Sequence, residues 1–253
     1  MTTIASSPTM FHEPELVGQT VIVIGGSSGI GLETARRART EGADIIVSGR
    51  NPDRLRRAAD ELGALNAMSF DAYDSASLEA FFRTLPDPID HIMVTAGGPY
   101  YATLREMDLE QALRDVQEHL QLTLQVARSS IGRVRPGGSL LFDSGTGARR
   151  PAVGLTIASM MTAALPALIA NLALELAPVR VNLIAPGFVD TPLSAALLGD
   201  GLEERRQRLR ETLPIGRVVG PSDVAALAVH LMTNSALTGA TYDVDGGQQL
   251  VSA

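Results

Sequence analysis

The sequence predicts an α/β fold, a doubly wound sheet of seven mostly parallel strands with helices on both faces. Short runs of β-branched residues alternate with longer stretches of helical periodicity, which is the pattern of parallel strands joined by right-handed crossovers. A glycine-rich turn follows the first apolar run directly. The length of 253 residues suits one large domain around a single buried core.

The first half of the chain supplies four strands and the helices between them. The strands are rich in valine and isoleucine, as buried parallel strands are. Helical periodicity fills the intervening segments, beginning at about Ile30 in the first and covering 54–62 in the second. In order, these four predicted strands are 20–25, 43–49, 66–71 and 89–98.

The second half adds three strands, at 138–145, 179–187 and 240–247. Long helices are predicted over 109–128 and over about 155–176, and Pro166 should kink or loosen the second of them without dividing it. Between 192 and 220, glycines separate two short helices, a length suited to a mobile cover over a ligand. Residues 1–15 are predicted to be an N-terminal extension, and 16–253 to be one domain.

Composition excludes several classes of function. The net charge of −7 argues against a nucleic-acid partner, because binding to a phosphate backbone needs clustered positive charge. No apolar run is expected to reach the ~18 residues of a membrane helix, and the first residues lack the pattern of a signal peptide. We therefore expect a cytoplasmic protein with no membrane partner. Cysteine and lysine are both absent, which excludes thiolate chemistry and a lysine-assisted proton relay, and no metal site is predicted.

A nucleotide site is predicted at the first strand-to-helix turn, "IGGSSGIG". Its glycines Gly25, Gly29 and Gly31 come directly after an apolar strand and directly before a helix. Glycine lets the backbone approach a pyrophosphate closely, and the free amides and positive dipole end of the helix N-terminus bind that anion. Any tight turn from a strand to a helix also favours glycine, so other motifs are needed to identify this turn as a nucleotide site.

Further motifs supply that context in a fixed order along the chain. They are "SFDAYD" at 69–74, "VTAGG" at 94–98, "VNLIAPGFVDT" at 181–191 and "TYDVDGG" at 241–247. With the glycine turn, they resemble the short-chain dehydrogenase/reductase family from about Val17 to the C-terminus. The resemblance implies a Rossmann-type fold, a nicotinamide cofactor and a small-molecule substrate. It also implies a homo-oligomer, a tetramer or a dimer, because the helices at about 105–128 and 155–176 are apolar on more than one face.

The resemblance also assigns positions around the cofactor. It implies Asp71 near the adenine, Ala96 and Gly97 against the adenosine ribose, and the Pro186–Gly187 pair with Thr191 near the nicotinamide. Taken singly, Asp71 also fits a helix cap, and Pro186 with Gly187 a plain turn. The expected cofactor-binding residues are Gly25, Ser27, Ser28, Gly29, Ile30, Gly31, Arg50, Asn51, Asp71, Ala72, Ala96, Gly97, Gly98, Pro186, Gly187, Val189 and Thr191.

The end of the second strand predicts NADP(H) as the cofactor. An NAD-preferring site usually has a carboxylate there, which would repel a 2′-phosphate. Here Gly49 occupies that position and Arg50 follows, whose forked guanidinium suits a phosphate. Ser28 and Asn51 are possible polar helpers, and the alternative is that Arg50 is an ordinary surface arginine.

The catalytic positions of the family hold other residues in this chain. The resemblance places the family's tyrosine at Ala158 and its lysine at Thr162, and its serine and asparagine at Gly145 and His119. General acid–base help is worth ~10²–10⁴ in rate, so ordinary ketones should be poor substrates. A substrate that needs less help from a proton donor, such as an imine or a conjugated carbonyl compound, is favoured.

Three functions remain open at this stage. The first is a reductase with a different proton donor, for which the candidates are His119, Ser144, Tyr101 and Asp143, with Tyr100 beside them. The second is a catalytically silent NADP(H)-binding sensor or assembly protein. The third is a non-redox enzyme that reuses the pocket. His119 fits a structural histidine equally well, the two tyrosines fit pocket walls, and Met160 and Met161 fit core filling better than a substrate pocket.

Overall fold

The computed structural model describes residues 13–251. Most of the predicted N-terminal extension, residues 1–12, lies outside the described residues. Leu16 is fully buried, and its backbone N–H donates to the carbonyl of Glu41 at 2.9 Å. Leu16 is therefore packed against the end of helix α1 (Gly29–Thr40).

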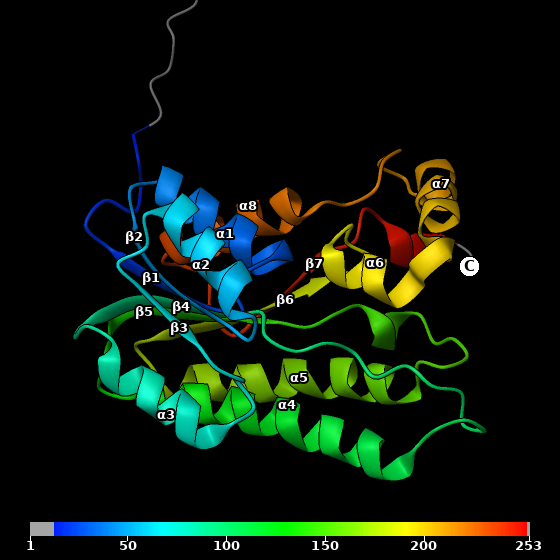
Figure 1. Cartoon of the computed structure of the whole chain (residues 1–253), viewed down its shortest axis with the longest axis horizontal. Helices are drawn as coiled ribbons and strands as arrows, with labels where there is room; N and C mark the ends of the chain where they lie inside the picture. Colours follow the sequence, from blue (N-terminus) through cyan, green and yellow to red (C-terminus); the bar gives the residue numbers. More distant parts are fainter. Residues whose placement is uncertain (1–12, 252–253) are drawn as a thin grey trace, which may run out of the picture.

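A seven-stranded sheet runs through the described residues in the order β3-β2-β1-β4-β5-β6-β7 (Figure 1). Every neighbouring pair of strands is parallel. The order reverses between β1 and β4, and ligands of doubly wound sheets bind at such a switch point, beyond the carboxyl ends of the strands. The strands are β1 Thr20–Ile24, β2 Asp44–Gly49, β3 Asn66–Ser69, β4 Ile89–Val94, β5 Val134–Asp143, β6 Arg180–Pro186 and β7 Thr241–Val244.

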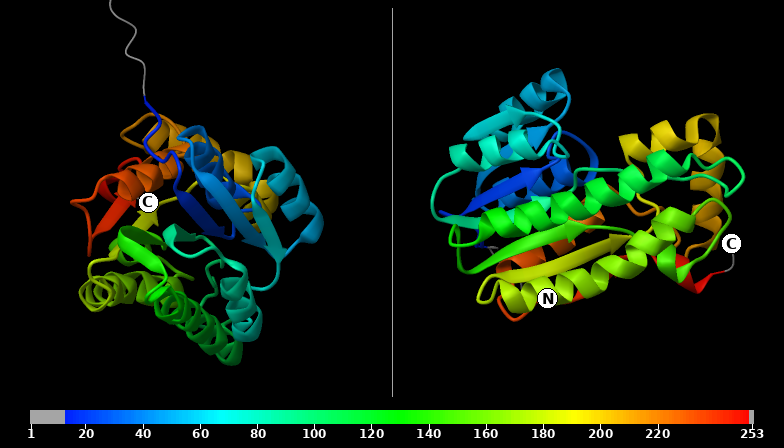
Figure 2. Two further views of the ribbon diagram at one scale, coloured as in Figure 1. Left: turned by 90° about the vertical axis from the view of Figure 1, so that its left-hand side faces the viewer. Right: turned by 90° about the horizontal axis from the view of Figure 1, so that it is seen from below.

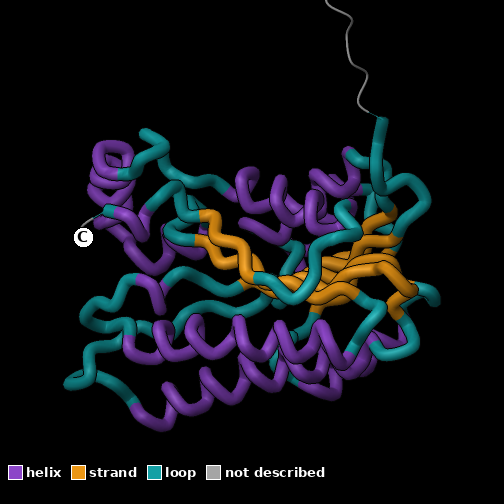
Figure 3. The backbone as a smooth tube through the Cα atoms, turned by 180° about the vertical axis from the view of Figure 1, so that it is seen from behind, coloured by secondary structure: helices purple, strands orange, loops and turns teal. Residues whose placement is uncertain are grey.

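Two layers of helices cover the sheet, as the end-on view and the tube both show (Figures 2 and 3). Buried side chains of α1, α2 and α8 pack on one face, and those of α3, α4 and α5 on the other. The sequence prediction of helices on both faces is thus confirmed. The helices are α1 Gly29–Thr40, α2 Pro52–Leu62, α3 Ser75–Thr84, α4 Leu109–Ser130, α5 Thr156–Glu175, α6 Pro192–Leu198, α7 Leu202–Thr212 and α8 Pro221–Thr233.

Helix α8 was not identified from the sequence. It begins with Pro221, and the Asp223 carboxylate accepts a hydrogen bond of 2.9 Å from the Gly220 amide, which closes a capping box. Its valines and alanines pack against α1. Strand β5 is also longer than predicted, because it begins at Val134 and not at Gly138.

The expectation that no apolar run reaches the length of a membrane helix is wrong for α5. By length and composition alone, Thr156–Glu175 is long and apolar enough to cross a membrane, with a mean hydropathy of 1.8. The serine, threonine and asparagine residues of α5 do not lower its mean hydropathy below that of a possible membrane-spanning helix. In the fold, α5 packs on β6 with Ile169 fully buried, so it serves as a sheet-covering helix. Pro166 lies inside α5 without dividing it.

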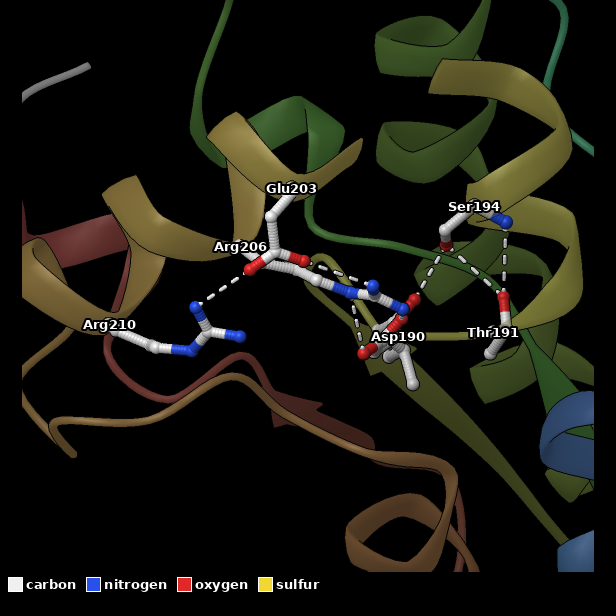
Figure 4. A network of polar contacts seen from close by, with 7 residues as sticks. Asp190, Thr191, Ser194, Glu203, Arg206 and Arg210 are labelled. Carbon is white, nitrogen blue, oxygen red and sulfur yellow. Dashed lines mark hydrogen bonds and ion pairs between the residues drawn. The ribbon is translucent and has the colours of Figure 1, made fainter. Parts of the chain in front are cut away.

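The predicted cover consists of α6 and α7, which lie together beyond one end of the sheet (Figure 1). A single turn of 3-10 helix, Gly199–Gly201, separates them. Arg206 of α7 donates to both carboxylate oxygens of Asp190, at 3.0 and 2.7 Å, and so ties α7 to the segment after β6 (Figure 4). Thr191 caps α6 by accepting from the Ser194 amide at 3.2 Å.

Candidate functional site

The glycine turn between β1 and α1 forms a backbone cradle. Gly25 has φ +100°, which side chains other than hydrogen rarely allow. A Cβ at Gly31 would lie 2.4 Å from the Gly25 carbonyl oxygen, so only glycine fits there. Ser28 adopts an extended N-cap conformation, but within residues 13–251 its side chain makes no cap hydrogen bond. The first amides of α1 are therefore free to bind an anion.

The wall opposite this cradle follows β4. Gly97 has φ +120°, and a Cβ there would lie 2.6 Å from the Tyr73 hydroxyl. A Cβ at Gly98 would lie 3.8 Å from Leu193 of α6, and one at Gly29 would lie 3.6 Å from Thr191. The start of α6 thus approaches both the glycine turn and the loop after β4, and the predicted cover is therefore in contact with both segments.

Asp71 and Ala72 follow β3 as the resemblance requires. The Asp71 carboxylate accepts a hydrogen bond from the Tyr73 amide at 3.1 Å, and Ala72 is buried. The N-cap of α3 is Asp74, which accepts from Ala76 at 3.2 Å. The alternative that Asp71 caps this helix is therefore wrong.

The end of β2 holds no acidic side chain. A Cβ at Gly49 would lie 2.6 Å from the Ser27 hydroxyl oxygen, so Ser27 occupies the space that a carboxylate needs. Arg50 is exposed, and its side chain forms no hydrogen bond or ion pair with any residue described. Asn51 is the N-cap of α2, since its Oδ1 accepts from the Arg54 amide at 2.9 Å. Asn51, one of the two residues expected to assist Arg50 in binding a 2′-phosphate, is therefore already engaged as a helix cap.

The Pro186–Gly187 corner is a tightly packed turn. Pro186 ends β6, and a Cβ at Gly187 would lie 2.7 Å from both Asp245 Cβ and Gln248 Oε1. Val189 is buried and bridges to Val219. The corner is therefore held from behind by the segment after β7, which fixes the direction in which the chain enters α6.

Around the positions that the resemblance assigns to the family's tyrosine and lysine, side-chain hydroxyl groups of α5 bind the preceding segment of the chain. The Thr162 hydroxyl accepts from the Ala148 amide at 2.8 Å and donates to the Ala158 carbonyl at 2.9 Å. The Ser159 hydroxyl donates to the Gly147 carbonyl at 3.0 Å. These bonds dock a short 3-10 helix, Gly147–Arg149, on the first turns of α5. The Thr162 hydroxyl thus holds this 3-10 helix against α5.

Two polar groups at the end of β5 are buried without partners. Asp143 Oδ1 and Ser144 Oγ have no hydrogen-bond partner among the described residues. The register pairs Asp143 with Ile184, whose side chain lies in the core on the α1 side of the sheet, so the Asp143 side chain faces that side. Burial raises the pKa of Asp143 to about 7, against a smaller opposing effect of the Ser144 amide.

This segment lies directly beside the corner after β6. The Ser144 amide donates to the Ile184 carbonyl at 2.9 Å, and the Thr146 amide to the Pro186 carbonyl at 3.1 Å. A Cβ at Gly145 would lie 3.6 Å from both Pro186 O and Thr162 Cγ2. The segment from Ser144 to Thr146 thus lies beside the corner after β6, and Gly145 also adjoins Thr162 of α5.

His119 lies elsewhere in the cleft. Its Nδ1 is 2.7 Å from the Asp115 carbonyl oxygen, and its Nε2 is 3.0 Å from the Tyr73 hydroxyl. A Cβ at Gly97 would lie 3.0 Å from His119 Nε2, so the ring adjoins the wall of the cleft after β4. Burial, followed by the charge of Asp115, raises the pKa of Tyr73. Both ring nitrogens of His119 are thus engaged, which favours its structural interpretation.

Tyr73 contacts both His119 and the loop after β4, and the sequence analysis did not name it as a candidate site residue. Its position two residues after Asp71 was the available signal. Its contact with His119 depends on the packing of the β3–α3 loop against α4, which no local pattern reveals.

The remaining aromatic and sulfur candidates have separate places. Tyr100 accepts from the Asp108 amide at 3.1 Å and so braces the start of α4. Tyr101 is 51% exposed, and burial of its hydroxyl end raises its pKa. Met161 is buried and fills the core, whereas Met160 is 47% exposed.

Comparison with known proteins agrees with this geometry. Residues 24–249 match the family model described as "Enoyl-(Acyl carrier protein) reductase". The chain is 30% identical to the short-chain dehydrogenase/reductase ATR9 of Stachybotrys chlorohalonatus, over 92% of this chain and 98% of that protein.

Solved structures resemble the chain over nearly its whole length. The MalC reductase/Diels–Alderase of Malbranchea aurantiaca superposes with a TM-score of 0.87 at 27% identity, covering 94% of this chain and 99% of that one. A small-chain dehydrogenase in complex with NADPH superposes with a TM-score of 0.79 at 29% identity, covering 92% and 99%.

Proposed function

The chain belongs to the short-chain dehydrogenase/reductase family of oxidoreductases, and from this premise we propose that it is an NADP(H)-dependent reductase with a non-standard active site. The substrates are imines or conjugated carbonyl compounds. The observation that carries this proposal is the combination of a glycine-lined turn at the start of α1 with two buried side-chain atoms, Asp143 Oδ1 and Ser144 Oγ, that have no hydrogen-bond partner among the described residues.

The residues present fit a bound dinucleotide. Gly25 and Gly31 allow the turn to pack tightly against Thr95, and the first amides of α1, which no side chain caps within residues 13–251, are available to a pyrophosphate. Arg50 would hold a 2′-phosphate, and the Ser27 hydroxyl beside Gly49 keeps out the carboxylate that favours NAD(H). The relatives solved in complex with NADPH support this preference. When bound, the dinucleotide supplies the hydride of the reduction.

The substrate class follows from the groups beside the Pro186 corner. Reduction of a simple ketone places charge on an alkoxide, whereas an iminium is already cationic and a conjugated acceptor delocalises its charge. Ala158 and Gly145 bring no hydroxyl to stabilise an alkoxide. Asp143, with its pKa near 7, holds a proton at neutral to acidic pH and donates it as a general acid, with the Ser144 hydroxyl orienting the substrate.

A second candidate function rests on one relative. The structure most similar in backbone among those described above is of a protein named as both a reductase and a Diels–Alderase. A pocket that orients a reactive molecule without a tyrosine and lysine pair suits a pericyclic reaction, which transfers no proton. In this case the nucleotide would act as a scaffold, and turnover would not consume NADPH.

The protein is also proposed to be a homo-oligomer, a tetramer or a dimer. The outer face of α4 exposes Leu113 by 68% and Leu124 by 48%, and these side chains line one groove with Val116 and Leu120. An apolar face of this kind is unfavourable in water unless another subunit covers it. Light scattering should show a dimer or tetramer that Leu113→Glu converts to a monomer, and a monomeric wild-type protein would contradict the proposal.

A substrate panel with NADPH tests the reductase function. We expect NADPH oxidation with 2-methyl-1-pyrroline or cyclohexenone at rates at least ~10²-fold above acetophenone. Asp143→Asn should abolish most of this activity, while the exposed α2 variant Asp60→Asn is the matched control. Equal turnover of acetophenone would refute the substrate class. No oxidation with any member of the panel, although NADPH binds by fluorescence, would favour a silent binding protein or the non-redox enzyme.

A further inference from the structure

Three arginines without acidic partners gather beside the corner after β6. Arg205 and Arg208 lie on α7, and Arg150 directly follows the short 3-10 helix docked on α5. None of the three side chains forms an ion pair or hydrogen bond with any residue between 13 and 251. Burial, and after it the charges of Arg208 and Arg150, lower the pKa of Arg205, so Arg208 and Arg150 each lie within electrostatic range of Arg205.

Other arginines on the same two segments are paired, whereas these three are not. On the same helix, Arg206 binds Asp190 at 2.7 Å and Arg210 binds Glu203 at 3.0 Å (Figure 4). Arg149, next to Arg150, binds Asp243 at 2.9 Å. Arg150 and Arg205 are half-buried, whereas Arg208 is exposed. A partly buried guanidinium with no acceptor is unfavourable, and an anionic ligand would remove that cost for the first two.

The fold fixes where this positive charge lies. The Arg206–Asp190 ion pair holds α7 against the segment after β6, and the next side chain, Arg205, has its Cζ 5.8 Å from the centre of the Phe188 ring. Phe188 directly follows Gly187, and its amide donates to Gln248 Oε1 at 2.9 Å. Arg150 follows the segment that Thr162 and Ser159 bind to α5. The cluster thus draws on α7, which contacts Phe188 after the Gly187 corner, and on the segment docked on α5.

We infer that Arg150, Arg205 and Arg208 form a subsite for a carboxylate or phosphate group on the substrate, with Phe188 packing against the apolar part of the same molecule. This inference deepens the proposed reductase function, on which it rests, by naming the substrate as an amphiphilic anion. Guanidinium groups form charge-assisted, forked hydrogen bonds with both kinds of anion. The local positive charge in a chain of net charge −7 would also steer such a substrate towards the cleft.

The test measures binding separately from turnover. Hexanoate, hexyl phosphate and hexanol are titrated calorimetrically into the full chain, with and without NADP⁺. We expect at least one of the two anions to bind about tenfold more tightly than hexanol, and Arg205→Gln to weaken that anion about tenfold, as for a lost charge-assisted hydrogen bond. Arg150→Gln should weaken it as well. The control is Arg83→Gln, an exposed arginine on α3, which should leave binding unchanged.

The outcomes separate the possible sources of the anion. Binding of hexanoate alone assigns the subsite to carboxylates, binding of hexyl phosphate alone assigns it to phosphates, and binding of both supports the shared chemistry. Equal affinity for hexanol would overturn the inference. Anion binding that NADP⁺ abolishes and that both arginine variants leave unchanged would overturn it too, because the anion would then occupy the glycine turn.

This subsite and the proposed function fail in different ways. Anion binding without NADPH oxidation would refute the reductase and leave the subsite standing. NADPH oxidation of the neutral panel substrates, without anion binding, would support the reductase and refute the subsite.

Discussion

Replacement of Asp143 by asparagine should stabilise the protein in alkaline solution much more than in acid. In the unfolded chain this carboxyl group ionises near its ordinary pKa of 3.8, whereas burial raises its pKa in the folded protein to about 7. The folded state therefore holds the proton more tightly, and stability is lost as the pH rises from 3.8 through about 7. Asparagine cannot ionise, so the variant avoids this loss.

The magnitude follows from the difference between the two pKa values. One pKa unit corresponds to ~1.4 kcal/mol, so the ionised carboxylate costs about 4 kcal/mol of unfolding free energy above pH 7. At about pH 5 less than half of this cost is present, because the folded-state carboxyl group is still protonated. The advantage of the variant over the wild type should grow by roughly 3 kcal/mol between about pH 5 and about pH 9. For a chain of this size, that is a gain of ~5–10 °C in Tm.

Thermal unfolding of the nucleotide-free protein at the two pH values measures this effect. The variant is compared with the wild type at each pH, so that other titrating groups cancel, and Asp60→Asn serves as the exposed control. If Asp143→Asn differs from the wild type by the same amount at both pH values, the carboxylate is not buried as described. The same proton links stability to function, because NADPH oxidation supported by Asp143 should decline as the pH rises through about 7.

Three further predictions concern other parts of the fold. Arg50→Gln should weaken NADPH binding at least ~10-fold and NADH binding far less, because only the 2′-phosphate loses a charged partner; equal losses by fluorescence titration would argue against this role. Burial lowers the pKa of His91 to about 3, so stability should fall by ~1.4 kcal/mol per pH unit below about 6.5 in the wild type and not in His91→Gln, as measured by denaturant unfolding. The double variant Ala158→Tyr with Thr162→Lys should reduce acetophenone poorly. It should also lose ~1–3 kcal/mol of stability, because the Ala148 amide loses its acceptor. Vigorous reduction of acetophenone by a stable variant would contradict both expectations.

The architecture was predictable because its signals are local. Alternating β-branched and helical segments predict a parallel sheet. The glycines at 25 and 31 predict a tight turn, and the φ value of Gly25 and the close contacts at both positions admit only glycine. The absence of lysine is likewise a property of the sequence, and it excluded the usual proton relay without any coordinates. Helix α8 escaped notice because the prediction passed directly from the cover segment to the last strand.

The roles of the polar residues were decided only by tertiary contacts. His119 is engaged with Tyr73 because the loop after β3 packs against α4, and these residues are 46 positions apart in the chain. Asp143 acquires its raised pKa from burial at a strand end, and of the adjacent arginines on α7 it is Arg206, and not Arg205, that pairs with Asp190. Burial and charge pairing depend on what the rest of the fold places around a side chain, so a linear sequence names the candidates and the packing selects among them.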